Sequence, residues 1–265
     1  MSSPAIAPGA SRCLDAEIAG AVNLRDLGGL RAGVGKDRVR HGLLFRSGIT
    51  HEIEADGWRR LRQTHGIRRV LDLRSNRELE RDGIAPLAEH GIAFHHVAVY
   101  GTTALTPDME QQRYRQMLRR EYDWSERYKV LAGEHPESFV AFFHGIAAPG
   151  ALPAIFHCSA GRDRTGIAAA LVLEVLGVAR EDIVSDYAAT GRHLRPHIHR
   201  YTRVKRQLSF SDEELATALD TQPEHMQRFL DWIEREHGGA ERFLLANGLS
   251  KEALRSLRES LLETS

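Results

Sequence analysis

Short apolar runs separated by polar turns recur along the chain. Three of them, LLFR at 43–46, RVLDL at 69–73 and GIAFHHVAVY at 91–100, have the length and composition of strands. A fourth run, AIFH at 154–157, is equally short and apolar. These four runs predict the strands of a sheet, and the run at 69–73 in particular predicts a buried strand.

Segments with helical spacing of apolar residues alternate with these strands. Over 50–64, Ile53, Trp58 and Leu61 share one helical face, and Gly66 ends the helix. The further helices are expected at 106–122, 125–144, 165–176, 211–219, 223–236, 240–247 and 251–262. The helix expected at 165–176 is apolar nearly all round, which predicts that it is buried against the sheet.

This order of elements favours an α/β fold with a central, mostly parallel sheet flanked by helices. No long linker, low-complexity tract or internal repeat follows residue 20, so we expect one domain over 21–265. Residues 1–20 are rich in Ala, Ser, Pro and Gly and predict a flexible N-terminal arm. The segment 106–144 predicts a helical insertion that is either part of the core or a lid, and the chain should end in helices.

Composition excludes several classes of protein. The chain of 265 residues is 42% hydrophobic and 27% charged, as in ordinary globular proteins. Its 36 basic and 36 acidic residues cancel, and nucleic-acid binders usually carry a basic excess. The N-terminus lacks the basic start and apolar run of a signal peptide. The longest apolar stretch, 167–178, falls short of the ~20 residues that span a bilayer. We therefore expect a cytoplasmic protein with no nucleic-acid partner and no stable membrane insertion.

Cysteine and histidine usage limits the kinds of site that the chain can hold. Two cysteines, Cys13 and Cys158, exclude a disulfide scaffold and a structural zinc site built on cysteine, and they fit a reducing compartment. A lone cysteine is usually a small hydrophobic residue, so Cys13 should be inert. Among the histidines, His193 and His197 have i, i+4 spacing, with His199 close behind. No carboxylate completes a plausible metal site with them, so we expect a solvated segment.

The chemistry of the chain is concentrated in HCSAGRDRTG at 157–166. A strand delivers Cys158 to the start of a tight loop, and a helix follows the loop. Backbone N–H groups in such a loop, with a helix N-terminus behind them, form an anion-binding cradle. Arg164 adds a planar fork that can hold two phosphate oxygens. The positive charge of Arg164 and of the helix N-terminus also favours the thiolate form of Cys158. A thiolate facing a bound phosphate predicts hydrolysis of phosphoesters through a phosphocysteine intermediate.

The segment matches H-C-x-x-G-x-x-R-[ST], the signature of the cysteine-based protein tyrosine phosphatase superfamily. Its longer form resembles the bacterial tyrosine-phosphatase-like branch, whose members act on phosphotyrosine, on phosphoserine or phosphothreonine, and on phosphoinositides. Further fragments fit the branch: NLRDLGG at 23–29, FRS at 45–47, and DLRS at 72–75 with Glu78. The resemblance covers about residues 21–262.

The resemblance implies a role for most residues of the loop. Cys158 would be the nucleophile, and Arg164 would bind the phosphate and stabilise the transition state. Thr165 would hydrogen-bond the cysteine sulfur and ease breakdown of the phosphoenzyme, while His157 would orient the loop. The phosphate-binding cradle would be formed by Ser159, Ala160, Gly161, Arg162, Asp163 and Arg164. The resemblance implies no cofactor and no metal.

The general acid stays open between two aspartates. Asp163, inside the cradle, is the first candidate, because the resemblance implies that the loop aspartate donates a proton to the leaving oxygen. Asp72, directly after a strand, is the second candidate. Asp123 has about the spacing of the general acid in other relatives, but its charged, helical surroundings match poorly.

The expected substrate is a phosphorylated protein or a phosphoinositide. Many relatives in the branch have lysine where this chain has Arg162, and that lysine is linked to phosphoinositide recognition. Activity on phosphopeptides, with phosphotyrosine first, is therefore the stronger expectation. Two alternatives remain: a rhodanese- or arsenate-reductase-like thiol enzyme, and a catalytically silent phosphate-binding module.

Overall fold

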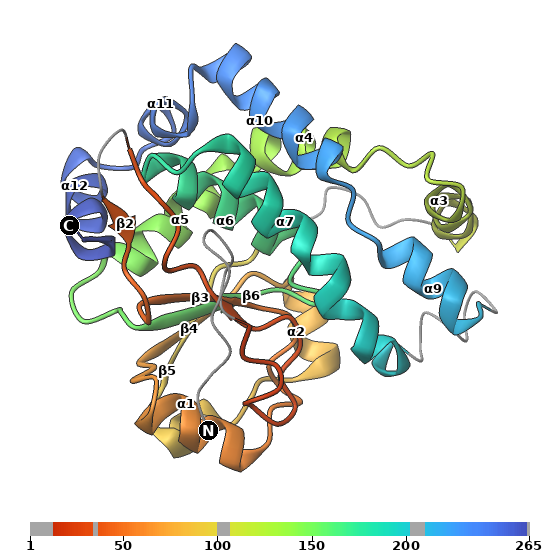
Figure 1. Ribbon diagram of the computed structural model, residues 1–265, viewed down its shortest axis with the longest axis horizontal. Helices are drawn as coiled ribbons and strands as arrows, with labels where there is room; N and C mark the ends of the chain where they lie inside the picture. Colours follow the sequence, from red (N-terminus) through yellow and green to blue (C-terminus); the bar gives the residue numbers. More distant parts are fainter. Residues whose placement is uncertain (1–12, 34–36, 100–106, 202–209, 264–265) are drawn as a thin grey trace.

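A five-stranded sheet runs through the middle of the molecule (Figure 1). The computed structural model describes residues 13–33, 37–99, 107–201 and 210–263. The strands of the sheet are β1 (Arg25–Asp26), β3 (Leu44–Ser47), β4 (Arg69–Asp72), β5 (Ala93–His96) and β6 (Ala154–His157). They lie in the order β1-β3-β6-β4-β5, with β1 antiparallel to β3 and the other neighbours parallel. The expected α/β fold with a mostly parallel sheet is therefore confirmed.

Helices account for most of the remaining chain. They are α1 (Ala55–Gln63), α2 (Asn76–Asp82), η1 (Leu87–His90), α3 (Pro107–Leu118), α4 (Trp124–Glu134), α5 (Pro136–Ala147), α6 (Asp163–Val175), α7 (Arg180–Leu194), η2 (Arg195–Arg200), α9 (Asp212–Leu219), α10 (Pro223–His237), α11 (Ala240–Ala246) and α12 (Lys251–Leu261). A short antiparallel pair, β2 (Arg38–Val39) with β7 (Leu262–Glu263), ties the end of the last helix to the N-terminal part.

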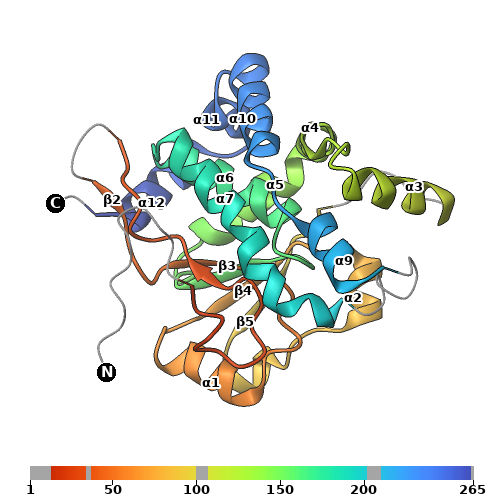
Figure 2. The same ribbon diagram turned by 45° about the vertical axis from the view of Figure 1, so that its right-hand side comes forward.

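The sheet separates two hydrophobic cores. Along β3, Leu44 packs with the larger core, which includes residues of α4 to α6 and α10 to α12, whereas Phe45 belongs to the smaller core with Trp58 of α1. Along β6, Phe156 and Ile155 alternate in the same way. Both faces of β3 and β6 are buried because successive side chains point to opposite faces and helices cover each face. Figure 2 shows α1 on one side of the sheet and α6 and α7 on the other.

Helix α6 is buried on almost every side, as its sequence predicts. It contacts β3 and β6 of the sheet, and α4, α7 and α11 surround it. Ten of its residues are buried, from Thr165 to Val175. This burial fixes the N-terminus of α6, and with it the loop that connects α6 to β6.

Several expected elements differ from those observed. The single helix expected at 125–144 is two helices, because Pro136 at the first turn of α5 lacks the N–H that a continuous helix needs. The strand expected at 91–100 is regular only over β5. Helix α2, which is not among the expected helices, begins directly after β4, because Ser75 and Glu78 form a capping box. Helix α7 was not predicted at all.

The expected flexible arm is ordered in the part that the structure describes. Leu14 and Ile18 are buried in the smaller core, 1% and 0% exposed, and the backbone N–H of Leu14 donates to the carbonyl oxygen of Leu24. The arm expected over 1–20 is thus corrected for 13–20, where two apolar side chains face the sheet. Residues 1–12 lie outside the described residues.

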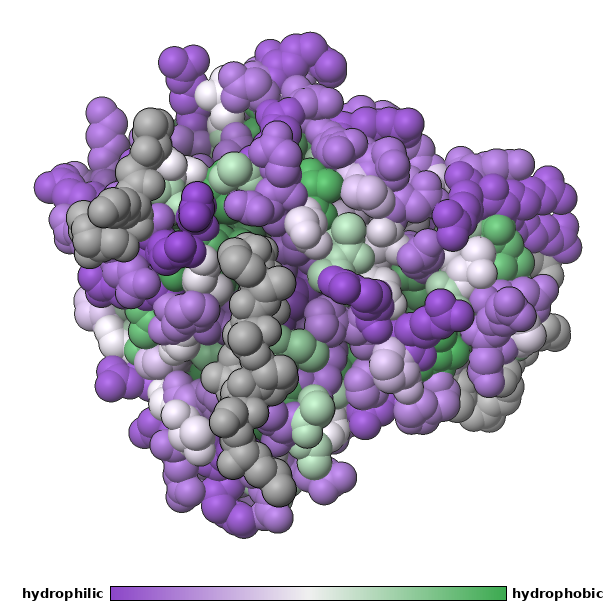
Figure 3. Space-filling view, viewed as in Figure 1, coloured by the Kyte–Doolittle hydropathy of each residue, from purple (hydrophilic) through white to green (hydrophobic). Residues whose placement is uncertain are grey.

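The surface is mainly polar. The face seen in Figure 3 is mostly hydrophilic, with apolar residues in small groups. Among the described residues, the exposed large hydrophobic side chains are those of Ile84 and Val130. In the same part of the chain, no helix is both long and apolar enough to cross a membrane.

Candidate active site

The loop that follows β6 begins at Cys158 and ends at the N-terminus of α6. Gly161 adopts φ +67°, and a Cβ at this position would lie 2.4 Å from the carbonyl oxygen of Ser47 at the end of β3. Only glycine combines this backbone conformation with such a close approach. The Gly in the middle of the motif therefore lets the loop turn back tightly against the sheet.

Three carbonyl groups of the loop are held from outside. The Ser159 oxygen accepts the backbone N–H of Ile49 at 3.0 Å. The side-chain amide of Asn23 donates to the oxygens of Ala160 and Gly161, each at 3.1 Å, and Arg46 donates to the Gly161 oxygen at 2.8 Å. The C=O and N–H of a trans peptide point in opposite directions. The following N–H groups therefore point to the other side of the loop, where an anion would be held.

A buried ion network fixes Arg46, which holds the loop, together with the neighbouring Arg25. Asp186 of α7 accepts hydrogen bonds from both Arg25 and Arg46, and Arg25 also donates to Thr190 at 3.0 Å. Both arginine side chains are 0% exposed. Burial and the neighbouring Arg25 lower the pKa of Arg46 to about 10, so its guanidinium stays charged at neutral pH. The NLRDLGG and FRS fragments thus support the loop from behind.

Replacing Asn23 by glycine should weaken this support. Asn23 has φ +57°, so glycine keeps the backbone unstrained while removing the two hydrogen bonds to the loop. We expect the free energy of unfolding in urea to fall by about 1–3 kcal/mol, with a lower kcat on an aryl phosphate. Asn23→Ala should lose a further ~1 kcal/mol, because alanine is strained at positive φ. A glycine variant with wild-type stability and kcat would contradict the role of Asn23.

Arg164 lies at the start of α6 and is held by Glu78 of α2. Its two terminal nitrogens donate to the Glu78 carboxylate at 2.6 and 2.8 Å, and Ser159 donates to the same carboxylate at 2.7 Å. Burial acts to raise the pKa of Glu78, but Arg164 and Ser159 outweigh it and hold that pKa far below its usual range. A guanidinium has five N–H groups, so Nε and the adjacent terminal nitrogen still offer an edge for a phosphate. Glu78 therefore orients the fork without occupying all of it.

The side chain of Arg162 does not face the cradle. Its guanidinium stacks on the Trp124 ring at 4.0 Å and donates to Asp163 at 3.0 Å, and the side chain is only 4% exposed. Such a cation–π contact with a tryptophan stabilises a buried arginine. Only the backbone N–H of Arg162 is thus available to an anion in this arrangement.

Asp163 is the first residue of α6 and is braced by α4. One carboxylate oxygen accepts hydrogen bonds from the Tyr128 hydroxyl at 2.8 Å and from Arg162, and the Tyr187 hydroxyl lies 2.7 Å from that of Tyr128. Burial acts to raise the pKa of Asp163, but Arg162 and Tyr128 outweigh it, so the pKa is lowered. Its side chain remains 23% exposed, which leaves it accessible to a substrate.

Asp72, by contrast, is closed in beneath the loop. It forms a bidentate ion pair with Arg74, with Nε and the terminal nitrogen 3.0 and 2.7 Å from Oδ2, and its side chain is 0% exposed. His157 lies 3.5 Å from the same oxygen and 3.2 Å from the hydroxyl of Thr50. Burial lowers the pKa of His157, so the ring is neutral at pH 7. Asp72 therefore orients Arg74 and His157 instead of reaching the cradle.

Cys158 lies at the floor of the loop, 2% exposed, in the electrostatic field of Arg46 and Arg164. The hydrogen bond expected from Thr165 to its sulfur is not formed. The Thr165 hydroxyl is buried and has no hydrogen-bond partner within the described part of the chain. Asp123 caps α4 through Ser125 and pairs with Arg228, so it serves the helix and not the loop.

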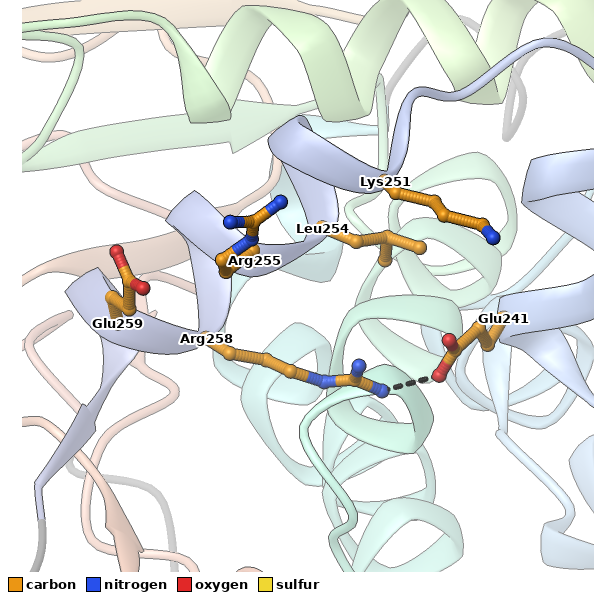
Figure 4. A pocket seen from close by; sticks show the side chains of 6 residues that line it. All are labelled: Glu241, Lys251, Leu254, Arg255, Arg258 and Glu259. Carbon is orange, nitrogen blue, oxygen red and sulfur yellow. Dashed lines mark hydrogen bonds and ion pairs between the residues drawn. The ribbon is translucent and has the colours of Figure 1, made fainter.

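The groups around the loop come from distant parts of the chain, and most of them were not predicted from the sequence. They are Asn23, Arg46, Glu78, Tyr128, Asp186 and Tyr187. Asn23, Arg46 and Glu78 do lie in the fragments that carry the family resemblance, but the sequence assigned them no contact with the loop, and Tyr128, Asp186 and Tyr187 carried no such signal. A separate pocket of about 350 Å³ lies on α11 and α12, where Arg258 pairs with Glu241 (Figure 4). None of its lining residues belongs to the loop.

The structure thus places a cysteine at the end of a parallel strand, a tight loop after it and an arginine at the start of the following helix. Residues 16–263 match the model of the tyrosine phosphatase family, and the chain belongs to that family. The structure thus agrees with the resemblance seen in HCSAGRDRTG.

Two curated relatives illustrate the relationship. A putative tyrosine-protein phosphatase of Cupriavidus necator is 39% identical over 168 residues, which cover 62% of this chain and 59% of that protein. The triple specificity protein phosphatase PtpB of Mycobacterium tuberculosis is 26% identical over 284 aligned positions, covering 93% of this chain and 98% of that protein. A crystal structure of TpbA from P. aeruginosa is 15% identical, covers 80% of this chain and 98% of its own, and has a TM-score of 0.35. A TM-score this low shows only a distant similarity between the two structures.

Proposed function

We propose that this protein is a protein-tyrosine phosphatase that hydrolyses phosphomonoesters through a phosphocysteine intermediate. The observation that carries the proposal is the loop after β6: it begins at Cys158, its Ser159, Ala160 and Gly161 carbonyl groups are held from outside, and Arg164 stands where it enters α6. The family match supports phosphatase chemistry over the rhodanese- or arsenate-reductase-like alternative. Because a cysteine, an arginine and an aspartate are all in place, the proposal also disfavours a silent phosphate-binding module.

The proposed reaction has two steps. The Cys158 thiolate attacks phosphorus, the P–O bond to the leaving group breaks, and Asp163 gives its proton to the leaving oxygen. Water then attacks the phosphocysteine, Asp163 takes a proton from that water, and inorganic phosphate and the thiolate are released. The loop N–H groups and Arg164 stabilise the charge on the phosphoryl oxygens in both transition states. The Thr165 hydroxyl is free to donate to the departing sulfur.

We assign the proton transfers to Asp163 and not to Asp72. Asp163 is the first residue of α6, directly after the loop, and is partly exposed, whereas Asp72 is fully buried in its ion pair with Arg74. The lowered pKa of Asp163 means that it is a carboxylate in the free protein at neutral pH. A bound phosphate dianion would raise that pKa, because two negative charges in one site repel each other. Substrate binding would thus supply the acid form that the first step needs.

Phosphotyrosine in proteins is the proposed substrate, ahead of phosphoserine, phosphothreonine and phosphoinositides. An inositol ring with several phosphates needs further cations beside the cradle, and the guanidinium of Arg162, which belongs to the loop itself, is packed on Trp124. The relative from M. tuberculosis is named a triple specificity protein phosphatase. Phosphoserine and phosphoinositide substrates are therefore tested alongside phosphotyrosine. Because the nucleophile must remain a free thiol, we place the activity in a reducing compartment, the cytoplasm.

A panel of substrates tests the proposal. Wild-type protein should release inorganic phosphate from phosphotyrosine peptides with a kcat/KM at least about 10-fold above that for phosphoserine peptides and phosphoinositide vesicles, a difference of about 1.4 kcal/mol. Thiosulfate and arsenate serve as controls for sulfur transfer and arsenate reduction. Phosphate release from phosphoinositides alone would overturn the substrate assignment, and turnover of thiosulfate or arsenate alone would overturn the phosphatase assignment.

A further inference from the structure

Three side chains of kinds that can bind a metal ion meet where residues 13–15 contact the last turn of α7. They are Cys13, Asp15 and His193, and their ligand atoms all lie within 4.8 Å of one another. The Cys13 sulfur is 3.2 Å from Nδ1 of His193, and that nitrogen is 3.7 Å from a carboxylate oxygen of Asp15. Nε2 of His197 is 4.0 Å from the same oxygen. The structure thus corrects two expectations: His193 is not simply solvated, and Asp15 supplies the missing carboxylate.

The spacing of these atoms suits a small divalent cation. Zn²⁺ binds sulfur at about 2.3 Å, imidazole nitrogen at about 2.0–2.1 Å and carboxylate oxygen at about 2.0–2.2 Å. In a tetrahedral site the ligand atoms are then roughly 3.4–3.6 Å apart. The observed separations of 3.2 and 3.7 Å lie on either side of that range. A thiolate with an imidazole and a carboxylate is also a donor set that zinc accepts and that Mg²⁺ or Ca²⁺ does not favour.

The ligands are held in place by the surrounding chain. Both oxygens of Asp15 accept backbone N–H groups, from Leu24 at 2.6 Å and from Asn23 at 3.0 Å. His193 lies in the last turn of α7, a helix that is fixed by the ion network of Asp186. Hydrogen bonds of this kind orient metal ligands and raise their affinity. Cys13 is exposed and Asp15 and His193 are 12% and 18% exposed, so an ion can enter from solvent.

We propose that Cys13, Asp15 and His193 bind a zinc-like divalent cation, with His197 or a water molecule in the fourth position. On binding, the Cys13 thiol gives its proton to solvent and its sulfur bonds to the metal. The ion would tie the N-terminal segment to α7. Asp15 also contacts the backbone of Asn23, whose amide holds the Ala160 and Gly161 carbonyls, so the ion would steady the catalytic loop from a distance. The proposal does not depend on the phosphatase activity.

Cobalt provides a direct test, because Co²⁺ takes the same ligands as zinc and its absorption reports sulfur coordination. The full chain carrying Cys158→Ser has Cys13 as its one remaining cysteine, since the sequence contains two. Titration with Co²⁺ should give one equivalent of binding, a thiolate-to-cobalt charge-transfer band and the strong visible bands of tetrahedral cobalt. Zn²⁺ should displace the cobalt and raise the melting temperature.

Variants in the same Cys158→Ser background separate the site from adventitious binding. Cys13→Ser should abolish the charge-transfer band, and His193→Ala should weaken binding by more than about 100-fold, beyond the usual effect of losing an outer-sphere partner. His199→Ala is the matched control, because this exposed histidine lies outside the cluster, and it should leave the band and the affinity unchanged. The proposal is overturned if cobalt binds without the charge-transfer band, or if His193→Ala binds as tightly as the parent. Cys13 is exposed, so its substitution reports on the site without threatening the fold.

Discussion

Serine in place of Cys158 should reduce the hydrolysis of an aryl phosphate by more than about 10⁴-fold, because removing the nucleophile of a catalytic unit abolishes its chemistry. The change replaces one buried sulfur by oxygen and leaves the held carbonyl groups and Arg164 in place. The anion cradle should therefore survive. The measurement is initial-rate kinetics, with protection by inorganic phosphate against thermal unfolding as the control for an intact site.

The same experiment distinguishes the proposed mechanism from direct attack by water. If Arg164 and the loop N–H groups alone catalysed hydrolysis, the serine variant would keep much of its rate. Retained turnover in a variant that still binds phosphate would contradict a nucleophilic role for Cys158. Loss of phosphate binding would show instead that the thiol is needed for the shape of the loop.

Asp163→Asn should slow hydrolysis of a phosphotyrosine peptide by about 10²–10⁴-fold, the usual contribution of a general acid. An aryl phosphate whose leaving group is already acidic needs no proton, so its rate should fall much less. The ratio of the two rates is the readout, because a purely structural defect would lower both alike. Asp72→Asn is the control: breaking its buried pair with Arg74 should cost about 3–5 kcal/mol of stability without changing that ratio.

The pH dependence follows from the same assignment. A general acid must be protonated, so kcat should fall on the alkaline side as Asp163 loses its proton in the bound complex. Burial acts to raise the pKa of Asp163 in the free protein, but Arg162 and Tyr128 lower it overall. The decline in kcat/KM, which reports the free protein, should therefore begin at lower pH than the decline in kcat. An Asp163→Asn variant that kept the alkaline decline and the leaving-group ratio would exclude Asp163 as the acid.

The local features of this protein were predictable because they depend on adjacent residues. The run AIFH at 154–157 forms β6, and the cysteine, glycine and arginine that follow it form the tight loop that leads into α6. The two-residue strands β1, β2 and β7 are too short to show any periodicity. Helix α7 was missed although Ile183, Val184 and Tyr187 do have helical spacing, since Gly191 and charged residues obscure the pattern.

The support of the loop could not be predicted, because it joins residues that are far apart in the sequence. Asn23 contacts a carbonyl 137 residues away, and the pair of Arg25 with Asp186 spans 161 residues. Which arginine meets which carboxylate depends on the strand order and on the position of α7. The same holds for Cys13 and His193, whose 180-residue separation hid their contact. The direction of the Arg162 side chain likewise depends on Trp124, which α4 brings from elsewhere.

The phosphocysteine itself provides the most direct test of the central claim. Wild-type protein is mixed with an excess of an aryl phosphate, quenched in acid within the first turnovers, digested and mapped by mass spectrometry. We predict one phosphoryl group on the peptide that contains Cys158, appearing together with a burst of the leaving group. A burst with no phosphorylated peptide, or a phosphoryl group on any other residue, would contradict the account.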